Sequence, residues 1–409
     1  MGVGGRSAVY LAGVEPTQET PVSEMFNPSS TATAFDEHTT IVAVLELSGK
    51  NWLLGAIAPG VKVRSKRSLA ARDIEGVATA LEKLKAQSQQ AGFAVQRIVA
   101  AYEAGRDGFW IARALQARGY EVHVMHASSI PIERRAKRVK TDRIDIDLLL
   151  RTLLGWLRAE PGRCTMAPIP TEEEEDMREP GRHRNRLVGD RLKVENRIGG
   201  LLVRHGVTGF NPRLKSAHKK LAELKTYDGR PLPPRTTDSL RLLMAQHRLL
   251  SQQLEEIEAD RAKVIEVETP DRLQRRIQAL AGLIGVGVET ATVLVHEVFS
   301  RRFKDRRALG GFVGLTGTPY DSGGSKTEQG ISKNGNPHVR RMLSQLAWRW
   351  LRHQPTSALT QWFYSRLSGA EGRMKKVLAV AMTRKLLIAL WRLVETGELP
   401  AGARLAARR

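Results

Sequence analysis

The chain has 409 residues, of which 41% are hydrophobic and 26% are charged, a composition typical of a globular protein. This length predicts two or three domains, each with a hydrophobic core of its own. The 65 Lys and Arg residues exceed the 43 Asp and Glu residues and leave a formal net charge of +22. Such a basic balance predicts a polyanionic partner, either nucleic acid or an anionic membrane surface.

The apolar segments favour nucleic acid over a membrane. The most hydrophobic late stretch, residues 377–394, is interrupted by Arg384, Lys385 and Arg392, so we expect no membrane span. The N-terminus lacks the apolar core of a secretory signal, and the single Cys164 excludes an internal disulfide, so we expect a cytoplasmic protein. A single cysteine among ten scattered histidines argues against a structural zinc site and favours a metal bound by oxygen.

The first part of the chain predicts a tail followed by an α/β domain. Residues 1–36 are rich in Gly, Ser, Thr and Pro and predict a disordered tail, and residues 37–160 predict the domain. Its expected elements are a hairpin of strands Thr40–Leu47 and Trp52–Ala58, a helix Arg72–Gln90, a strand Arg97–Tyr102, a helix Gly108–Arg118, a strand Glu121–Met125, and a helix that begins near Asp142. Functional residues are then expected at the carboxyl ends of the strands.

The rest of the chain predicts two further domains. In residues 172–268, Leu187, Val194 and Leu201 recur every seven residues, as do Leu243, Leu250, Ile257 and Val264, with Leu240 and Leu254 in a second row. This spacing predicts two long helices that form a coiled-coil arm. Residues 271–400 predict a mainly helical C-terminal domain. It begins with a helix-hairpin-helix-like segment around Gly285 and Gly287, continues through a glycine-rich loop over 314–335, and ends in two helices.

Four carboxylates are candidates for a metal site. Glu46 ends the first strand, Glu103 follows Tyr102, and Asp142 and Asp145 share one face of a helix because they lie three residues apart. Together they could hold one or two Mg²⁺ or Mn²⁺ ions that assist phosphoryl transfer. Each residue also has an ordinary interpretation: Asp142 as a helix cap, Glu103 as part of a turn, and Glu46 as a solvated side chain.

Ser322 is the candidate nucleophile. It lies between glycines and close in sequence to Lys326 and Lys333, so that its hydroxyl would be exposed beside cations that stabilise charge on a phosphate. The ordinary interpretation is a turn serine. Basic and amide side chains near both sites are expected to bind the nucleic-acid backbone: Arg138, Lys140, Arg143, Lys326, Lys333, Asn336, Arg340 and Arg341.

These motifs, in this order, resemble the DEDD transposases of bacterial insertion sequences, the one-ten family. The resemblance is carried by Glu46, Tyr102-Glu103-Ala104-Gly105, Lys140-Thr141-Asp142-Arg143-Ile144-Asp145, Ser322-Gly323-Gly324 and the run from Gly330 to Asn336, and it extends to the closing Arg384-Lys385-Leu386-Leu387. It covers nearly the whole chain from about residue 39.

The resemblance implies an RNase H-like (RuvC-like) N-terminal domain, a coiled-coil arm and a C-terminal transposase domain whose serine completes a composite site. It implies that Glu46, Glu103, Asp142 and Asp145 form the acidic set and that Ser322 is the nucleophile. The implied partners are double-stranded DNA of the element ends and target, a structured guide RNA encoded by the element, and further copies of the chain in a dimer or tetramer. The family usually has Asp at the first acidic position, whereas this chain has Glu46.

Two other functions stay open at the level of sequence. A junction-resolving nuclease would use the same acidic site with water and leave Ser322 with a structural role. An inactive remnant would still bind nucleic acid through its basic charge but would have lost catalysis. The longer side chain of Glu46, in place of the usual Asp, favours this interpretation.

Overall fold

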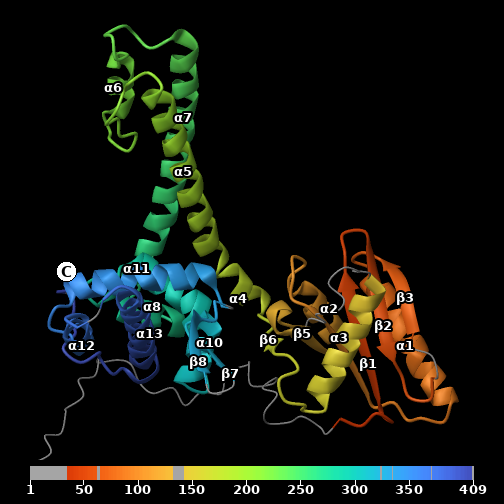
Figure 1. Cartoon of the computed structure of the whole chain (residues 1–409). Helices are drawn as coiled ribbons and strands as arrows, with labels where there is room; N and C mark the ends of the chain where they lie inside the picture. The colour runs from red at the N-terminus through yellow and green to blue at the C-terminus, as the bar shows by residue number, and fades with distance from the viewer. Residues whose placement is uncertain are drawn as a thin grey trace, which may run out of the picture. The chain divides into compact units, whose positions relative to one another are not determined.

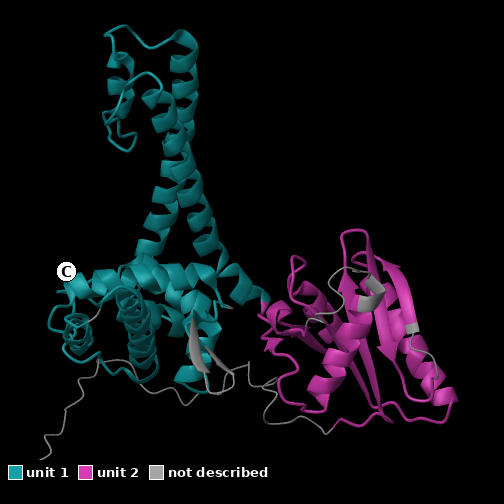
Figure 2. Cartoon of the chain, viewed as in Figure 1, with its two compact units in different colours: residues 1–18, 172–409 teal, residues 19–171 magenta. Residues whose placement is uncertain are grey.

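The computed structural model describes residues 35–61, 65–131, 142–322, 325–333, 335–369 and 371–407, without the side chains of residues 65, 142–144, 319–322 and 325–329. The predicted disordered tail up to residue 34, and the predicted nucleic-acid ligands Arg138 and Lys140, lie outside these residues. The chain divides into two compact units, one of residues 19–171 and one built on residues 172–409 (Figure 2).

The first unit contains a mixed six-stranded sheet whose order is β3-β2-β1-β4-β5-β6. The strands are β1 (Thr40–Leu47), β2 (Asn51–Ile57), β3 (Ser65–Ala70), β4 (Arg97–Glu103), β5 (Glu121–Met125) and β6 (Met166–Ala167). The first three strands are antiparallel neighbours, β4 and β5 run parallel to β1, and β6 is antiparallel to β5. The predicted α/β class and the predicted β1–β2 hairpin are confirmed, whereas β3 was not predicted.

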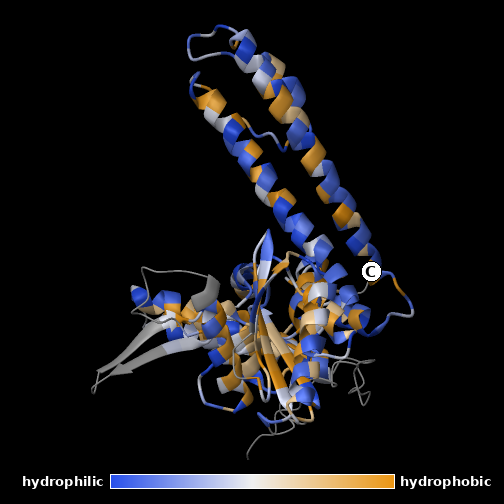
Figure 3. Ribbon diagram, turned by 90° about the vertical axis from the view of Figure 1, so that its right-hand side faces the viewer, coloured by the Kyte–Doolittle hydropathy of each residue, from blue (hydrophilic) through white to orange (hydrophobic). Residues whose placement is uncertain are grey.

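Helices cover both faces of this sheet. Alternate residues of β1 belong to two separate cores, as the two-residue period of a strand requires. Ile41, Ala43 and Leu45 pack with α1 (Ile74–Gln90) and α2 (Trp110–Gln116). Val42 and Val44 pack with α3 (Asp142–Leu157), which lies across the other face (Figure 1). The strands between these layers are the most apolar part of the unit (Figure 3).

Gly55 of β2 lets α3 approach the sheet closely. A Cβ atom at this position would lie 2.3 Å from Cγ2 of Ile146 and 3.4 Å from Cδ1 of Leu150, so any side chain would push the helix away. Ile146 and Leu150 are themselves fully buried. The position of α3 on the sheet therefore depends on the missing side chain of Gly55.

The second unit begins with a two-helix arm. After α4 (Glu172–Asp176), the long helices α5 (Glu179–Val203) and α7 (Pro234–Ala262) pack side by side, and α6 (Ala217–Glu223) packs at their far end (Figure 1). The buried residues are Leu187, Val194, Ile198 and Leu202 on α5 and Leu240, Met244, His247, Leu250 and Leu254 on α7. The row through Leu240 and Leu254 is thus the innermost one, and Leu243 and Ile257 are only partly buried.

A polar contact crosses the arm between its helices. Glu195 of α5 accepts hydrogen bonds from Arg213 at 2.8 and 2.7 Å and contacts Nε2 of the buried His247 at 3.1 Å. The hydrogen bonds from Arg213 hold the pKa of Glu195 below its ordinary value. Because a buried polar group needs its partner, this contact favours one register of α5 against α7.

The rest of the second unit is a helical domain with one hairpin. Its elements are the 3₁₀ turn Lys263–Ile265, α8 (Arg272–Ala281), α9 (Val288–Leu294), the π-helical turn Val295–Phe299, α10 (Arg306–Val313), β7 (Gly317–Ser322), β8 (Ser325–Ile331), α11 (Pro337–His353), α12 (Ala358–Leu367) and α13 (Arg373–Thr396). A single apolar core joins α8 to α13, with Trp350, Phe299 and Leu390 fully buried.

Two expectations for this domain are wrong. We expect a glycine-rich loop over 314–335, but β7 and β8 form an antiparallel pair, because Thr318, Tyr320 and Thr327 favour extended backbone. Three helices, not two, finish the chain. None of the helices in the described part of the chain is both long enough and apolar enough to cross a bilayer.

Candidate functional site

Glu46 and Glu103 lie at the carboxyl ends of neighbouring parallel strands. The register pairs Leu45 of β1 with Tyr102 of β4, so the two glutamates are the next residues along each strand. Adjacent strands are about 4.8 Å apart. Glu46 continues the face of Val42 and Val44, and Glu103 continues the face of Val99 and Ala101. Both glutamates are therefore placed on the face that α3 covers.

The direction of α3 places its first residues near the same edge. Just after the helix, Arg158 is 3.4 Å from Glu37 and lies over the ring of Phe35, and both of those residues precede β1. The end of α3 thus lies near the start of β1, and the beginning of α3 points toward the end of β1. Asp145 is half-buried and lies four residues before the buried Leu149, on the inward side of the helix.

The sheet and α3 thus bring the predicted acidic positions toward one end of the first unit. Asp142 is the first residue of α3, and the side chains of Asp142 and Arg143 lie outside the described part. Among the described side chains, which exclude Asp142, no three His, Cys, Asp or Glu groups are close enough to share a metal ion. A site built from these four positions would offer only carboxylate oxygens, the ligand type that Mg²⁺ and Mn²⁺ prefer.

Asp147 has a different role from its neighbour Asp145. Its Oδ2 accepts a hydrogen bond from Lys66 of β3 at 2.7 Å, which ties α3 to the antiparallel edge of the sheet. At the opposite end of the strands, burial raises the pKa of Glu121, but hydrogen bonds from His123 and Arg97 outweigh burial and lower it to about 2. Both carboxylates therefore belong to ion pairs that hold the domain together.

Ser322 is the last residue of β7, in the second unit. It pairs with Ser325, and Asp321 pairs with Lys326, so Lys326 is the cation nearest to Ser322 along the hairpin. The expectation that Lys333 lies beside Ser322 is wrong. Lys333 follows the end of β8, where Ile331 pairs with Gly317, and five residues of strand separate that end from Ser322, about 17 Å.

The base of this hairpin is held tightly against α10. The Ser332 amide donates to the Thr316 carbonyl at 2.9 Å. A Cβ on Gly335 would lie 2.3 Å from the Phe312 carbonyl oxygen, so only glycine fits there. Lys333 is exposed and has a left-handed φ of 58°. The hairpin therefore projects from a fixed base.

Two of the predicted nucleic-acid ligands already have contacts within the chain. The Asn336 Oδ1 accepts from the His338 and Val339 amides and so caps α11, while its Nδ2 donates to Glu297 at 2.9 Å. Arg340 donates through Nη1 to the Val313 carbonyl at 3.1 Å. Arg341, in contrast, is exposed.

Glu297 joins the hairpin base to the arm, a role that the sequence did not indicate. It lies in the π-helical turn and is 6% exposed. Besides Asn336, it accepts from Arg182 of α5 through Nε at 2.9 Å and Nη2 at 3.2 Å. The available signal was a lone carboxylate within the apolar run from Val293 to Phe299.

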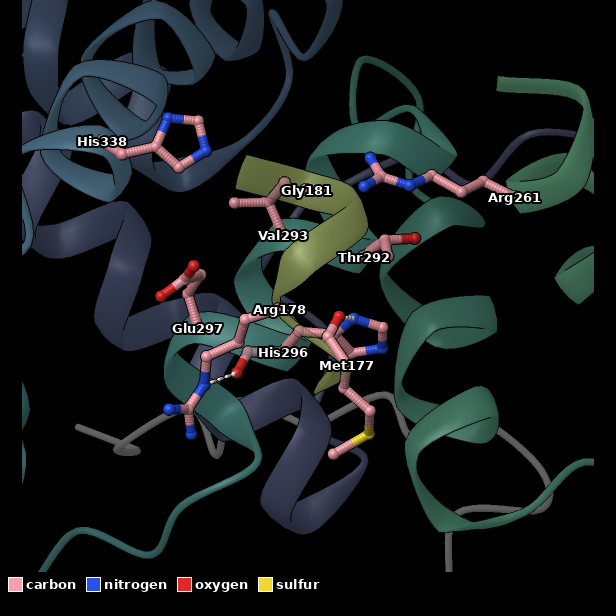
Figure 4. A pocket seen from close by; sticks show the side chains of 9 residues that line it. All are labelled: Met177, Arg178, Gly181, Arg261, Thr292, Val293, His296, Glu297 and His338. Atoms are coloured by element: carbon pink, nitrogen blue, oxygen red, sulfur yellow. Dashed lines mark hydrogen bonds between the residues drawn. The ribbon is translucent and has the colours of Figure 1, made fainter. Parts of the chain in front are cut away.

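Glu297 lies on a small pocket at the foot of the arm (Figure 4). Arg178 also lines it and donates to the His296 carbonyl at 3.2 Å. The hydrogen bond to Glu297 raises the pKa of Arg182, whereas burial lowers the pKa of Arg178 and of His338. Burial and the neighbouring Arg178 lower the pKa of Arg301 to about 10. Cations crowd this region, so the charge of Glu297 is needed to balance them.

Comparison with known proteins defines the class to which this chain belongs. Residues 277–361 match the family described as Transposase IS116/IS110/IS902. The putative transposase y4rJ of Sinorhizobium fredii is 41% identical over 371 residues, which are 89% of this chain and 94% of that protein. The transposase for insertion sequence element IS1328 of Yersinia enterocolitica is 26% identical, over 72% of this chain and 82% of that protein.

The chain belongs to the IS116/IS110/IS902 family of insertion-sequence transposases. Membership implies cleavage and transfer of DNA strands and therefore DNA binding, as the basic charge predicted. The transposase for insertion sequence element IS1111A of Coxiella burnetii is a further relative, 26% identical over 56% of this chain and 61% of that protein.

Replacing Glu297 tests its role at the foot of the arm. We expect Glu297→Gln to lower the free energy of unfolding by about 1 to 3 kcal/mol, because it removes the buried charge that accepts from Arg182 and lies near the buried Arg178. Urea denaturation followed by circular dichroism measures this change. The matched control is Glu179→Gln, which breaks the exposed pair with Arg186 and should change stability by less than about 0.5 kcal/mol. Equal stability of the two variants would contradict the assignment.

Proposed function

We propose that the first unit is an RNase H-like catalytic domain in which Glu46, Glu103, Asp142 and Asp145 hold divalent metal ions for DNA strand cleavage. The observation that carries this proposal is the placement of Glu46 and Glu103 on adjacent parallel strand ends, on the face toward which α3 brings Asp145. The mixed sheet, with three antiparallel strands followed by two parallel ones, is compatible with that fold.

The proposed ions are Mg²⁺ or Mn²⁺, which take carboxylate oxygens as ligands. Bound there, they would stabilise the negative charge on the attacking and leaving oxygens of a phosphodiester. The protein supplies the fixed frame: β1 and β4 set the spacing of the two glutamates, and the packing of α3 on Gly55 sets the approach of the aspartates. The longer side chain of Glu46 reaches one methylene further than the aspartate usual at this position.

We further propose that Ser322 attacks the phosphate in the second half of a composite site. Its Oγ would form a bond to phosphorus while the bond to the bridging deoxyribose oxygen breaks, and the serine hydroxyl proton would be transferred, through solvent, to the released oxygen, which leaves as a hydroxyl group. Lys326, opposite Asp321 at the same end of the hairpin, is the cation available to the phosphate. The ester conserves the energy of the phosphodiester for rejoining.

The proposed partners follow from the charge and from the family. The net charge of +22 suits duplex DNA of the element ends and target together with a structured guide RNA of the same element. Arg138, Lys140, Arg143, Lys326, Lys333 and Arg341 are the proposed backbone contacts. Bringing two DNA segments together requires at least a dimer, and the arm offers a surface between copies of the chain.

A second candidate function is a metal-dependent nuclease without a covalent intermediate. It is favoured by one observation, that Ser322 and the acidic residues belong to different compact units. In that reaction water attacks the phosphate and Ser322 has only the structural role of a hairpin residue.

The metal site predicts a charge requirement at Asp142 and Asp145. We expect Asp142→Asn and Asp145→Asn to reduce strand cleavage in Mg²⁺ by about a hundredfold or more, because a lost ligand charge weakens metal binding while the basic surface is unchanged. Gel assays of cleavage and of DNA binding measure the two effects. Asp147→Asn, which loses a charge paired with Lys66 but none of the proposed metal ligands, should retain most of the cleavage activity. Wild-type cleavage by Asp145→Asn would refute the metal site.

The serine mechanism predicts a covalent protein–DNA adduct at Ser322. We expect wild-type protein with labelled element-end DNA, its RNA and Mg²⁺ to give a shifted band on a denaturing gel, with mass spectrometry placing the DNA on Ser322. Ser322→Ala should lose both the adduct and recombination. Ser325→Ala, the paired residue of β8, should at most weaken them. An adduct on Ser322→Ala, or recombination without any adduct, would leave the nuclease as the better description.

The proposed guide RNA predicts a preference that charge alone does not give. We expect the protein to bind the structured RNA of its own element at least tenfold more tightly than an unrelated RNA of equal length. Affinity for both should fall steeply with salt because phosphate contacts release counterions, but the ratio should persist. Filter binding across a salt titration measures this affinity ratio. Equal affinities for the two RNAs would show that the protein binds RNA only as a nonspecific polyanion.

A further inference from the structure

A long segment of the second unit contains no carboxylate. From Gln329 to Ala370 the sequence has no Asp or Glu. The same segment carries the basic residues Lys333, Arg340, Arg341, Arg349, Arg352 and Arg366. It contains all of α11 and α12, so neither helix carries a negative side chain, and α11 holds four of the arginines. In a chain with 43 Asp and Glu residues, such a surface is suited to a polyanion.

Two of these arginines, Arg341 and Arg352, lie on one exposed face of α11. Arg341, Gln345, Trp348 and Arg352 are all exposed and follow one another at spacings of four, three and four residues, which places them on one face of the helix. The opposite side is the core face, where Leu343, Leu346 and Trp350 are buried. Within the part of the chain that the structure describes, Arg341 and Arg352 make no ion pair with a carboxylate.

Two large aromatic side chains are exposed on the same helix pair. Trp348 of α11 is 59% exposed and Tyr364 of α12 is 52% exposed. Both rings pack edge-on against the buried Phe363, with ring centroids 6.1 and 5.6 Å apart and interplanar angles of 83° and 78°. Phe363 therefore contacts both exposed rings and supports each of them from the core side. Rings fixed in this way lose little conformational freedom when a flat partner stacks on them.

We propose that Trp348 and Tyr364, flanked by Arg341 and Arg352, form a stacking platform for the unpaired bases of single-stranded DNA. Aromatic side chains beside a basic track are the general means of binding single strands, because every base offers a flat face. Bases of intact duplex DNA are stacked on one another and do not reach such a platform. DNA strand transfer, which belongs to the family, generates unpaired strands. The proposal does not depend on the metal site or on Ser322.

Binding of a fluorescent oligothymidylate of about 15 nucleotides, measured by anisotropy in EDTA, tests the platform without any catalysis. We expect Trp348→Ala and Tyr364→Ala each to raise the Kd about tenfold, the size of one lost base stack. Trp348→Phe should recover most of the affinity. Binding of a duplex of equal length should change less than about twofold.

Two controls separate stacking from other effects. Tyr227→Ala removes an aromatic ring that is 83% exposed on the arm and should leave single-strand affinity unchanged. Arg352→Ala should lower the slope of log Kd against log salt by about 0.7, the value for one phosphate of a single strand. Because both rings are more than half exposed, the melting temperatures of the variants should match the wild type.

Three results would overturn the proposal. The first is an equal single-strand Kd for Trp348→Ala and Tyr227→Ala. The second is a loss confined to single-stranded RNA, which would make the platform part of RNA recognition. The third is an altered sedimentation coefficient of Trp348→Ala with unchanged DNA affinity, which would make the surface a contact between copies of the chain.

Discussion

The close contact between α3 and the bare backbone of Gly55 is the constraint on which the candidate acidic site depends. Ile146 and Leu150 occupy the space that a side chain at position 55 would fill, and this fixes the height of the helix above the sheet. The contact of Arg158 with Phe35 and Glu37 then sets the direction of the helix. Together these contacts carry Asp145 toward the strand ends where Glu46 and Glu103 lie. The apolar packing of α3 on the sheet thus determines the position of Asp145 relative to the two strand ends.

A second constraint acts in the other unit through Glu297. This buried carboxylate accepts hydrogen bonds from Arg182 of the arm and from Asn336 at the hairpin base. Because a buried charge must be paired, Glu297 fixes the base of the arm and the base of the hairpin to the same helical turn. The π-helical turn that carries Glu297 inserts an additional residue in the helix, a feature found often at functional positions. The hairpin that ends in Ser322 and the arm are therefore both anchored at Glu297.

Acidic and basic side chains are unevenly distributed along the chain. Glu297 pairs with Arg182 and Asp147 pairs with Lys66, whereas α11 and α12 contain no carboxylate. The proposed metal site would need local negative charge within a basic protein. Its four proposed ligands lie between residues 46 and 145, whereas the segment without carboxylates begins at residue 329.

The sequence alone determined the class of partner, the α/β character of the first unit and the position of most strands and helices, because net charge, hydrophobic period and turn residues are local properties. It also determined the family, through short motifs in a fixed order, which the relatives confirm. Sequence failed where local preference was weak: β3 carries charged residues on an edge, and the glycines near Ser322 concealed a hairpin. Only the tertiary structure placed Glu46 beside Glu103, separated Lys333 from Ser322, and revealed Glu297 and the ring pair on Phe363. These relations involve residues that are far apart in the chain or are set by strand register. They depend on tertiary packing, which cannot be read from local sequence patterns.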